Sequence, residues 1–185
     1  MKQNFFSGKG DQGSTGLLGA GRVMKSDPQI EALGALDEAT AALGLARSLC
    51  DLADVNETVL QVQRDLYELM GEVAATPENV SRFHNLTQEN LAWLESRVEA
   101  FGKQVEIPAE FIVPGDSPLS AFFNLARTVV RRAERQLVRL GQERAPANPE
   151  LILAYVNRLS TLCYMLELYV LKAGSGNPPT LVTKE

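Results

Sequence analysis

Three helix-start signals, each a capping side chain followed directly by proline, constrain the fold of this chain more than any other feature. They are Ser26-Asp27-Pro28, Ser117-Pro118 and Asn148-Pro149. Proline is favoured in the first turn of a helix, where its missing N–H costs no hydrogen bond, and the polar residue before it caps the free backbone amides. The chain is therefore predicted to consist mainly of helices.

Apolar residues recur at helical spacing after each signal and in two further stretches. These patterns predict five helices, at about 28–49, 55–75, 87–102, 118–140 and 149–172, and nothing in the chain has the pattern of a sheet. Such helices must bury their apolar faces against one another. The predicted fold class is all-α, a five-helix antiparallel bundle.

The length of 185 residues accommodates one domain with a real core and is too short for two of ordinary size. Six glycines between positions 8 and 21 exclude a regular element there and predict a shaped loop. The domain is therefore expected to comprise a glycine-rich loop (1–26), the bundle (27–172) and a flexible tail (173–185).

Charge and composition narrow the possible partners and location. The net charge of −5 gives no overall attraction to nucleic acid or to an anionic membrane, which favours a small anionic ligand. Cys50 and Cys163 lie in apolar helical patterns and are expected to be buried thiols, with no Cys/His cluster for a metal. His84 is the only histidine and is expected on the surface. The start of the chain lacks the features of a secretory signal, so we expect a cytoplasmic protein.

Arginines at 127, 131 and 135 recur every four residues in the predicted fourth helix. Side chains at this spacing are neighbours, so three guanidinium groups share one face. Glu134 can pair with one of them, and a polyanion such as a nucleotide triphosphate, which arginine binds bidentately, can compensate the others. The alternative is a solvated basic face.

The glycine-rich loop offers a second place for phosphate groups. Its glycines let backbone amides approach phosphate oxygens, and its hydroxyl and ammonium groups add hydrogen bonds and charge. The candidate phosphate ligands are Lys9, Gly10, Gly13, Ser14, Thr15 and Lys25. Asp11 is a candidate to orient the loop or a hydrated Mg²⁺ ion. The loop matches neither a Walker sequence nor a dinucleotide fingerprint, so a flexible N-terminal segment is an equal alternative.

Four segments, spanning residues 10 to 160, resemble the ATP:cob(I)alamin adenosyltransferases of the propanediol-utilisation type. The arginine segment with its upstream proline-glycine turn is the most specific of them. The segments are Gly10-Asp11-Gln12-Gly13-Ser14-Thr15 with Gly21-Arg22-Val23-Met24-Lys25; Glu31-Ala32-Leu33-Gly34-Ala35-Leu36-Asp37-Glu38; Phe111-Ile112-Val113-Pro114-Gly115 with Ala126-Arg127-Thr128-Val129-Val130-Arg131-Arg132-Ala133-Glu134-Arg135; and Tyr155-Val156-Asn157-Arg158-Leu159-Ser160.

This resemblance implies a homotrimeric bundle with ATP held between subunits and cobalamin stacked next to it. The implied reaction is attack by cobalt(I) on the ribose 5′-carbon of ATP, which forms adenosylcobalamin and expels triphosphate. Such a reaction needs positioning and charge stabilisation rather than a general acid or base. The implied partners are these small molecules and, downstream, a cobalamin-dependent enzyme that receives the product.

The resemblance also assigns residue roles. The loop and Lys25 would hold triphosphate and Mg²⁺, while Asn157 would help position the nucleotide. The residues implied at the nucleotide on the fourth helix are Arg127, Arg131 and Glu134. Asp37 would pair with Arg127 across the subunit interface. Phe111 would press on the lower face of the corrin, which keeps water and the lower base from cobalt; ordinary core packing is its alternative role.

The chain departs from the family pattern at several positions. The family usually has Thr where Lys9 stands, His at Asn124, Asp at Thr161 and an Ala-Arg pair near Glu167-Leu168. These departures keep two other readings open. One is a non-catalytic paralogue that binds ATP or a corrinoid as a sensor or carrier, and the other is a helical scaffold whose arginines serve only in subunit contacts.

Overall fold

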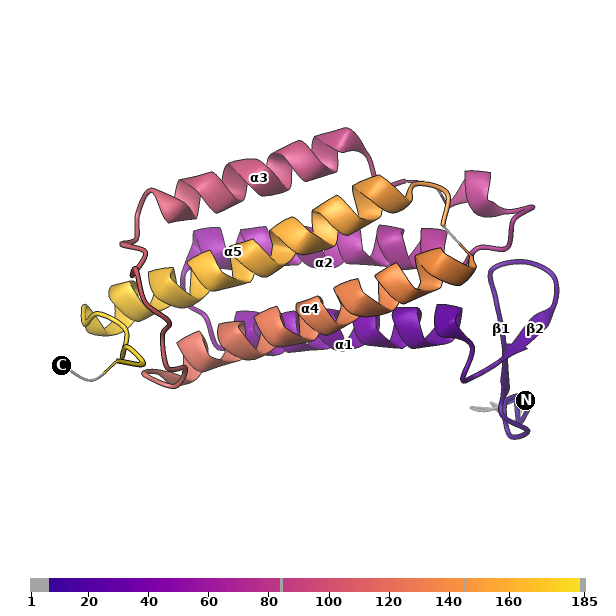
Figure 1. Ribbon diagram of the computed structural model, residues 1–185, viewed down its shortest axis with the longest axis horizontal. Helices are drawn as coiled ribbons and strands as arrows, with labels where there is room; N and C mark the ends of the chain where they lie inside the picture. Colours follow the sequence, from indigo (N-terminus) through magenta and orange to yellow (C-terminus); the bar gives the residue numbers. More distant parts are fainter. Residues whose placement is uncertain (1–6, 84, 145, 184–185) are drawn as a thin grey trace, which may run out of the picture.

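Five long helices form the bundle in a computed structural model that describes residues 7–83, 85–144 and 146–183 (Figure 1). The helices are α1 (Pro28–Ser48), α2 (Ala53–Ala74), α3 (Gln88–Gly102), α4 (Pro118–Glu143) and α5 (Pro149–Ser175), with a 3₁₀ turn, η1 (Val80–Arg82), between α2 and α3. The predicted all-α bundle is confirmed. The two last helices each run three residues beyond their predicted ends. Expectations for residues 1–6, His84 and 184–185 lie outside the described residues.

The capping side chains define where most helices begin. The Asp27 carboxylate accepts a hydrogen bond from the Gln29 amide at 2.9 Å, and Ser117 forms a reciprocal capping box with Ser120 at the start of α4. Thr87 caps α3 in the same way. Asn148 differs from the prediction because its side chain makes no cap bond, and its backbone N–H instead donates to Oε1 of Glu72 at 3.1 Å.

Consecutive helices run antiparallel, and the α4–α5 and α1–α4 pairs pack most extensively. Helices α3 and α5 also pack together, but they run in the same direction (Figure 1), as the bond from Nζ of Lys172 to the Gln104 carbonyl shows at their ends. Between α3 and α4 the chain must therefore cross one end of the bundle. The connector 103–117 makes this crossing, and it contains Phe111.

Helix α5 supplies much of the core. It is the one helix in the described part of the chain that is long and apolar enough to cross a membrane by composition, but 67% of its most apolar window is buried inside the bundle. Tyr155, Leu159 and Cys163 on this helix are each at most 1% exposed. Its apolarity is that of a core helix. Both predicted free thiols, Cys50 and Cys163, are buried as expected.

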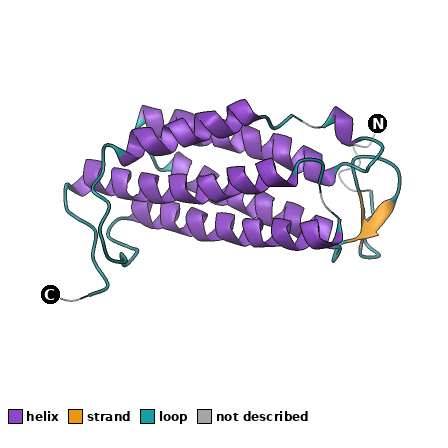
Figure 2. Cartoon of the chain, turned by 45° about the horizontal axis from the view of Figure 1, so that its top comes forward, coloured by secondary structure: helices purple, strands orange, loops and turns teal. Residues whose placement is uncertain are grey.

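A short hairpin precedes the bundle, so the prediction that no part of the chain forms a sheet was wrong. Strands β1 (Ser14–Gly16) and β2 (Arg22–Met24) pair antiparallel at the end of the bundle where α1 begins (Figure 2). Strands of three residues are too short to show an alternation that a sequence pattern can detect. The hairpin turn is attached to α2, because Leu18 exchanges backbone hydrogen bonds with Ala74 and Thr76 at 2.9 and 3.2 Å.

The segment after α5 begins later than the tail that was expected at 173–185. The first three residues of that range belong to α5, which ends at Gly176 in the left-handed conformation typical of a helix C-cap. The chain then turns back along the connector, where Leu181 forms an antiparallel bridge with Ile112. Residues 176–183 therefore border the connector that contains Phe111.

Candidate functional site

A groove of about 490 Å³ lies between the connector and one face of α4 and α5. The connector contributes residues 107–114 except Val113, and α4 contributes Asn124, Arg127 and Arg131. Helix α5 completes the lining with Ser160, Thr161 and Tyr164. The structure thus brings together three predicted site residues: Arg127, Arg131 and Phe111.

Phe111 is 86% exposed at the rim of this groove, so core packing is not its role. An aromatic side chain normally buries most of its area, and one held in solvent beside a groove indicates a surface that a ligand covers. Ile112 and Pro114 extend the apolar rim. The groove therefore combines an apolar edge with two cationic side chains.

Arg127 is half-buried, and its Nε atom is buried without a hydrogen-bond partner among the described residues. Burying such a donor costs free energy unless a partner satisfies it. Arg131, one turn further along α4, is exposed. Both side chains line the groove, so they are arranged to bind an anion that enters it.

The other charges of the arginine segment are used within the chain. Arg132 forms an ion pair with Glu38 on α1, and Arg135 donates to the backbone carbonyl of Arg131 at 2.9 Å. Glu134 accepts a hydrogen bond from Asn157 at 2.9 Å. The expectation that Glu134 pairs with an arginine of the stripe is therefore wrong among the described residues, because the α4–α5 packing directs its carboxylate to Asn157.

Two of the departures from the family pattern are in direct contact at the groove, where Asn124 is part of the lining and Glu167 lies behind it. Nδ2 of Asn124 donates to Oε1 and Oε2 of Glu167 at 3.0 and 2.9 Å. Glu167 is 2% exposed, and burial raises the pKa of its carboxyl group, although the Asn124 bond and the Arg127 charge act to lower it. The residues at 124 and 167 therefore form one buried polar unit. Leu168 faces elsewhere, into a cavity behind the connector.

The thiol of Cys163 and the phenol of Tyr164, both on the α5 side of the groove, do not supply a nucleophile or a base. Burial raises the pKa of the Cys163 thiol to about 12, and it also raises the pKa of Tyr164. Both groups are protonated at neutral pH, and a thiol in this state is a poor nucleophile. The arrangement suits chemistry that needs bound anions in fixed positions.

The glycine-rich loop is shaped by Arg22, which the sequence interpretation did not single out. Its Nη2 donates to the carbonyls of Lys9 and Ser14 at 2.7 and 2.8 Å, and its Nε donates to Oγ of Ser14 at 3.1 Å. Nζ of Lys25 lies beside Gly10, where an added Cβ would meet it at 3.4 Å. Gly13, at φ +77°, completes the turn. An arginine that organises a loop through backbone carbonyls leaves no sequence pattern by which it could have been found.

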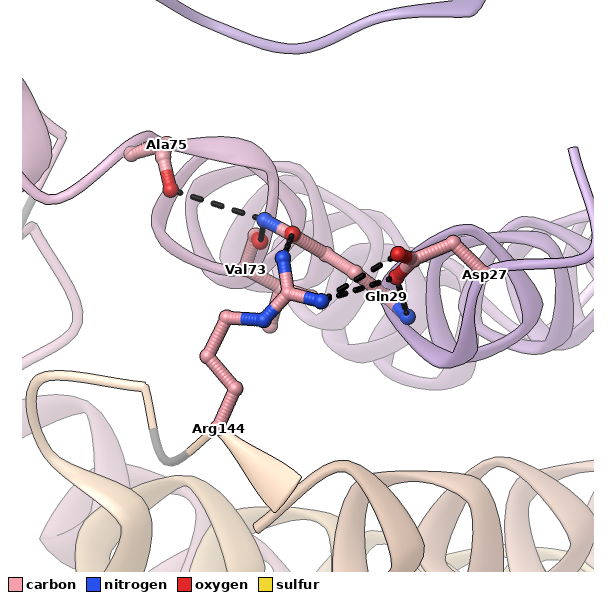
Figure 3. A network of polar contacts seen from close by, with 5 residues as sticks. All are labelled: Asp27, Gln29, Val73, Ala75 and Arg144. Atoms are coloured by element: carbon pink, nitrogen blue, oxygen red, sulfur yellow. Dashed lines mark hydrogen bonds and ion pairs between the residues drawn. The ribbon is translucent and has the colours of Figure 1, made fainter. Parts of the chain in front are cut away.

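A polar network fixes the start of α1 against the end of α4 (Figure 3). Arg144 reaches Asp27 at 3.2 Å and the side-chain carbonyl of Gln29 at 2.9 Å, and Gln29 in turn donates to the Val73 carbonyl at 2.6 Å. The hairpin, which leads directly into α1, is therefore located at the end of α4 that is remote from the connector. At 1.5 Å per residue, Arg127 lies about 24 Å before Glu143 along α4.

This separation keeps two groups of predicted site residues apart within one chain, while Glu134 and Asn157 bond to each other and are not part of the groove lining. Arg127, Arg131 and Phe111 meet at the groove, whereas the residues of the loop and Lys25 lie at the other end of the bundle (Figure 1). The distance exceeds the length of a triphosphate. Asp37 is exposed on α1 and forms no ion pair with Arg127 in the described part of the chain. No single chain therefore assembles all the predicted residues around one ligand.

Fold and groove together define a helical-bundle protein whose groove places two arginine side chains beside an exposed aromatic ring. The sequence profile of the cobalamin adenosyltransferases matches residues 5–170. A corrinoid adenosyltransferase of Bacillus subtilis is 35% identical over 157 residues, which are 82% of this chain and 78% of that protein. A cobalamin adenosyltransferase of Cupriavidus metallidurans is 37% identical over 169 residues, which are 91% of this chain and 88% of that protein.

A solved structure agrees with these matches. A variant of the PduO-type ATP:corrinoid adenosyltransferase from Lactobacillus reuteri, complexed with cobalamin and ATP, superposes with a TM-score of 0.89 at 26% identity, over 98% of this chain and 100% of that one. The chain belongs to the cobalamin adenosyltransferase family.

Proposed function

We propose that the protein transfers the 5′-deoxyadenosyl group of ATP to cob(I)alamin, forming adenosylcobalamin and releasing triphosphate. The observation that carries this proposal is the convergence of Arg127, Arg131 and the exposed ring of Phe111 on one groove. The family relatives are corrinoid adenosyltransferases, and the Lactobacillus reuteri variant was solved with both cobalamin and ATP bound. ATP and cobalamin are accordingly the substrates that we assign to this chain.

The groove fits the chemistry of this transfer. Cobalt(I) attacks the ribose 5′-carbon, the carbon–oxygen bond to the triphosphate breaks, and the leaving oxygen gains negative charge. Arg127 and Arg131 would stabilise that charge by hydrogen bonds aimed at the phosphate oxygens. The buried Nε of Arg127 would gain the partner that it lacks. The reaction requires no proton transfer, in keeping with the protonated thiol and phenol beside the groove.

Phe111 would act on the lower face of the corrin. An apolar ring beneath cobalt excludes water and the lower base, and a cobalt centre without these axial ligands is easier to reduce to the nucleophilic state. The high exposure of the ring supports this role, because the side chain is free to contact a large flat ligand.

We propose that the active unit is a homotrimer in which a site forms between subunits. The support is the separation of the hairpin from the groove, since a neighbouring subunit can supply the loop and Lys25 to a groove that lacks them. Across the same interface, the exposed Asp37 would pair with Arg127 and orient its guanidinium group. Glu134 and Asn157, already bonded to each other, would position the nucleotide.

Mg²⁺ would accompany the triphosphate. The described residues contain no group of three Asp, Glu, His or Cys side chains that could hold a metal ion, so phosphate oxygens and water would provide most of the ligands. Asp11 is the single carboxylate between residues 7 and 26 and would orient the hydrated ion.

A second candidate function is a non-catalytic paralogue that binds ATP or a corrinoid as sensor or carrier. The observation that favours it is the changed groove: Asn124 in its lining bonds to the buried Glu167, and Thr161 lines it where the family has an acid. The Asn124–Glu167 hydrogen bonds do not draw the two arginines away, because Arg127 and Arg131 still line the groove. We therefore retain the enzyme as the leading proposal. We also propose that it acts in the cytoplasm and that its product passes to a cobalamin-dependent enzyme.

Anaerobic turnover tests the choice between these functions. Chemically reduced cobalamin and ATP are mixed with the protein, and the visible spectrum is followed for formation of the cobalt–carbon bond. Adenosylcobalamin formation supports the enzyme. Nucleotide binding by calorimetry without turnover would instead support the paralogue. The absence of both binding and turnover would support a purely structural role for the arginines.

A further inference from the structure

The backbone on both sides of Phe111 is hydrogen-bonded to the segment that follows α5. The Val113 amide donates to the Thr180 carbonyl at 2.7 Å, and the Val182 amide donates to the Phe111 carbonyl at 2.9 Å. An antiparallel bridge joins Ile112 to Leu181 between these bonds. The position of the Phe111 backbone therefore depends on residues about 70 positions further along the chain.

Packing does not hold Phe111 in place. Its ring is 86% exposed, and behind the connector lies a cavity of about 530 Å³ lined by Leu168 and Leu171 of α5 and by Leu181. A segment that spans a cavity has few neighbours to fix its position. Hydrogen bonds along its edge must therefore do so.

Asp116 provides the strongest of these bonds. Its Oδ2 accepts from the Thr180 amide at 2.8 Å, and its Oδ1 accepts from the Thr180 hydroxyl at 2.7 Å. Both bonds have a charged acceptor, which makes them stronger than neutral ones. Asp116 directly precedes Ser117, the cap of α4, so this pair also joins the segment to the helix that contains Arg127 and Arg131.

We propose that Asp116 and Thr180 are positioning residues that hold Phe111 at the groove. The inference rests on the proposed function, because it assigns the pair a role in placing Phe111 against the corrin. Neither residue touches the substrates in this proposal. They act by limiting the connector to the arrangement in which the ring can cover the lower face of cobalt.

The role predicts a separation between chemistry and nucleotide binding. Without the pair, the connector samples arrangements in which the ring no longer excludes the axial ligands of cobalt. Loss of one to two hydrogen bonds of this kind lowers the equilibrium constant between the held and the released arrangement by about tenfold, so kcat falls by up to about tenfold. The KM for ATP should stay within about twofold, because Arg127 and Arg131 stay in place.

Four variants test the proposal. Asp116→Ala removes both side-chain bonds, Thr180→Val removes the hydroxyl bond alone, and Thr180→Ser retains it. Thr183→Val is the matched control, since Thr183 is exposed in the same segment and makes no side-chain hydrogen bond to any described residue. Each protein is assayed for turnover, and cob(II)alamin with ATP is examined by electron paramagnetic resonance for the four-coordinate signal.

We expect Asp116→Ala to lose up to about tenfold in kcat together with a matching share of the four-coordinate signal, with Thr180→Val between it and the unmodified protein. Thr180→Ser and Thr183→Val should behave as the unmodified protein does. Unchanged kcat and spectrum in Asp116→Ala, or a Thr180→Ser variant as defective as Asp116→Ala, would overturn the positioning role while leaving the proposed function intact. An unmodified protein that forms no adenosylcobalamin would overturn the proposed function itself, and the positioning role with it.

Discussion

Replacing Asn124 by alanine should destabilise the protein because the buried carboxylate of Glu167 loses its hydrogen-bond donor. Asn124 and Glu167 are 8% and 2% exposed, and one amide nitrogen serves both carboxylate oxygens at 3.0 and 2.9 Å. A hydrogen bond to a charged group contributes about 1.5–3 kcal/mol, and Asn124→Ala leaves the buried carboxylate without this donor. We expect the free energy of unfolding to fall by about 2–3 kcal/mol at pH 8.

A double-mutant cycle isolates this interaction from the cavity that alanine creates. Thermal unfolding is measured for the unmodified protein, Asn124→Ala, Glu167→Ala and the double variant at one protein concentration, because assembly would make the midpoint depend on concentration. For a chain of this size, a loss of about 2–3 kcal/mol lowers the midpoint by about 4–12 °C. The free energy of unfolding of the double variant should exceed the value expected from adding the two single losses by about 1.5–3 kcal/mol.

Effects that add to within about 0.5 kcal/mol would refute the reasoning, since independent sites behave in this way. The coupling should also weaken in acid. Below the raised pKa of Glu167 its carboxyl group is neutral, so removing Asn124 no longer leaves a buried charge without a hydrogen-bond donor. A coupling energy that stays constant across this titration would show that the ionised carboxylate is not its source.

Three further predictions concern single substitutions. Arg131→Ala should lower kcat about 10²–10³-fold. Its circular dichroism should be unchanged because Arg131 is exposed, and Arg139→Ala, at another exposed arginine of α4, is the control. Wild-type turnover and ATP affinity in Arg131→Ala would contradict the assignment of Arg131 to the ATP site. Asp37→Asn should weaken both assembly and ATP binding; sedimentation should give a mass near three chains for the unmodified protein, and a stable, fully active monomer would exclude the interface role. Glu167→Gln should remove a pH dependence of stability. Because burial raises the folded-state pKa of Glu167 above 4.5, this residue adds stability below pH 4.5 that is lost as pH rises through the raised pKa. A pH profile of the unfolding free energy that the substitution leaves unchanged would contradict this.

The helices could be predicted because each carries its own local signals. Ser117 and Asp27 cap their helices as the sequence indicated, and the apolar spacing located all five elements. The hairpin could not be predicted, because its three-residue strands depend on Arg22 and on the contact of Leu18 with α2. These are contacts between residues distant in sequence, for which local propensity carries no signal.

The same contrast applies to the candidate site. The one-turn spacing predicted that Arg127 and Arg131 share one face of α4, and both side chains line the groove. The pairing of Glu134 with Asn157, and of Asn124 with Glu167, joins α4 to α5 and depends on how the two helices are rotated against each other. Helical periodicity indicates which face of a helix is buried, but not which polar groups on that face will meet.

The distance between the hairpin and the groove has a genetic consequence under the proposed assembly. Each site would draw its loop from one subunit and its arginines from another, so a subunit defective in either part would damage a site that its neighbour shares. Conversely, a chain altered at Lys25 and a chain altered at Arg131 would complement each other when they assemble together. In a random mixture of equal amounts, about one quarter of the interfaces in a cyclic trimer would pair an intact loop with an intact groove.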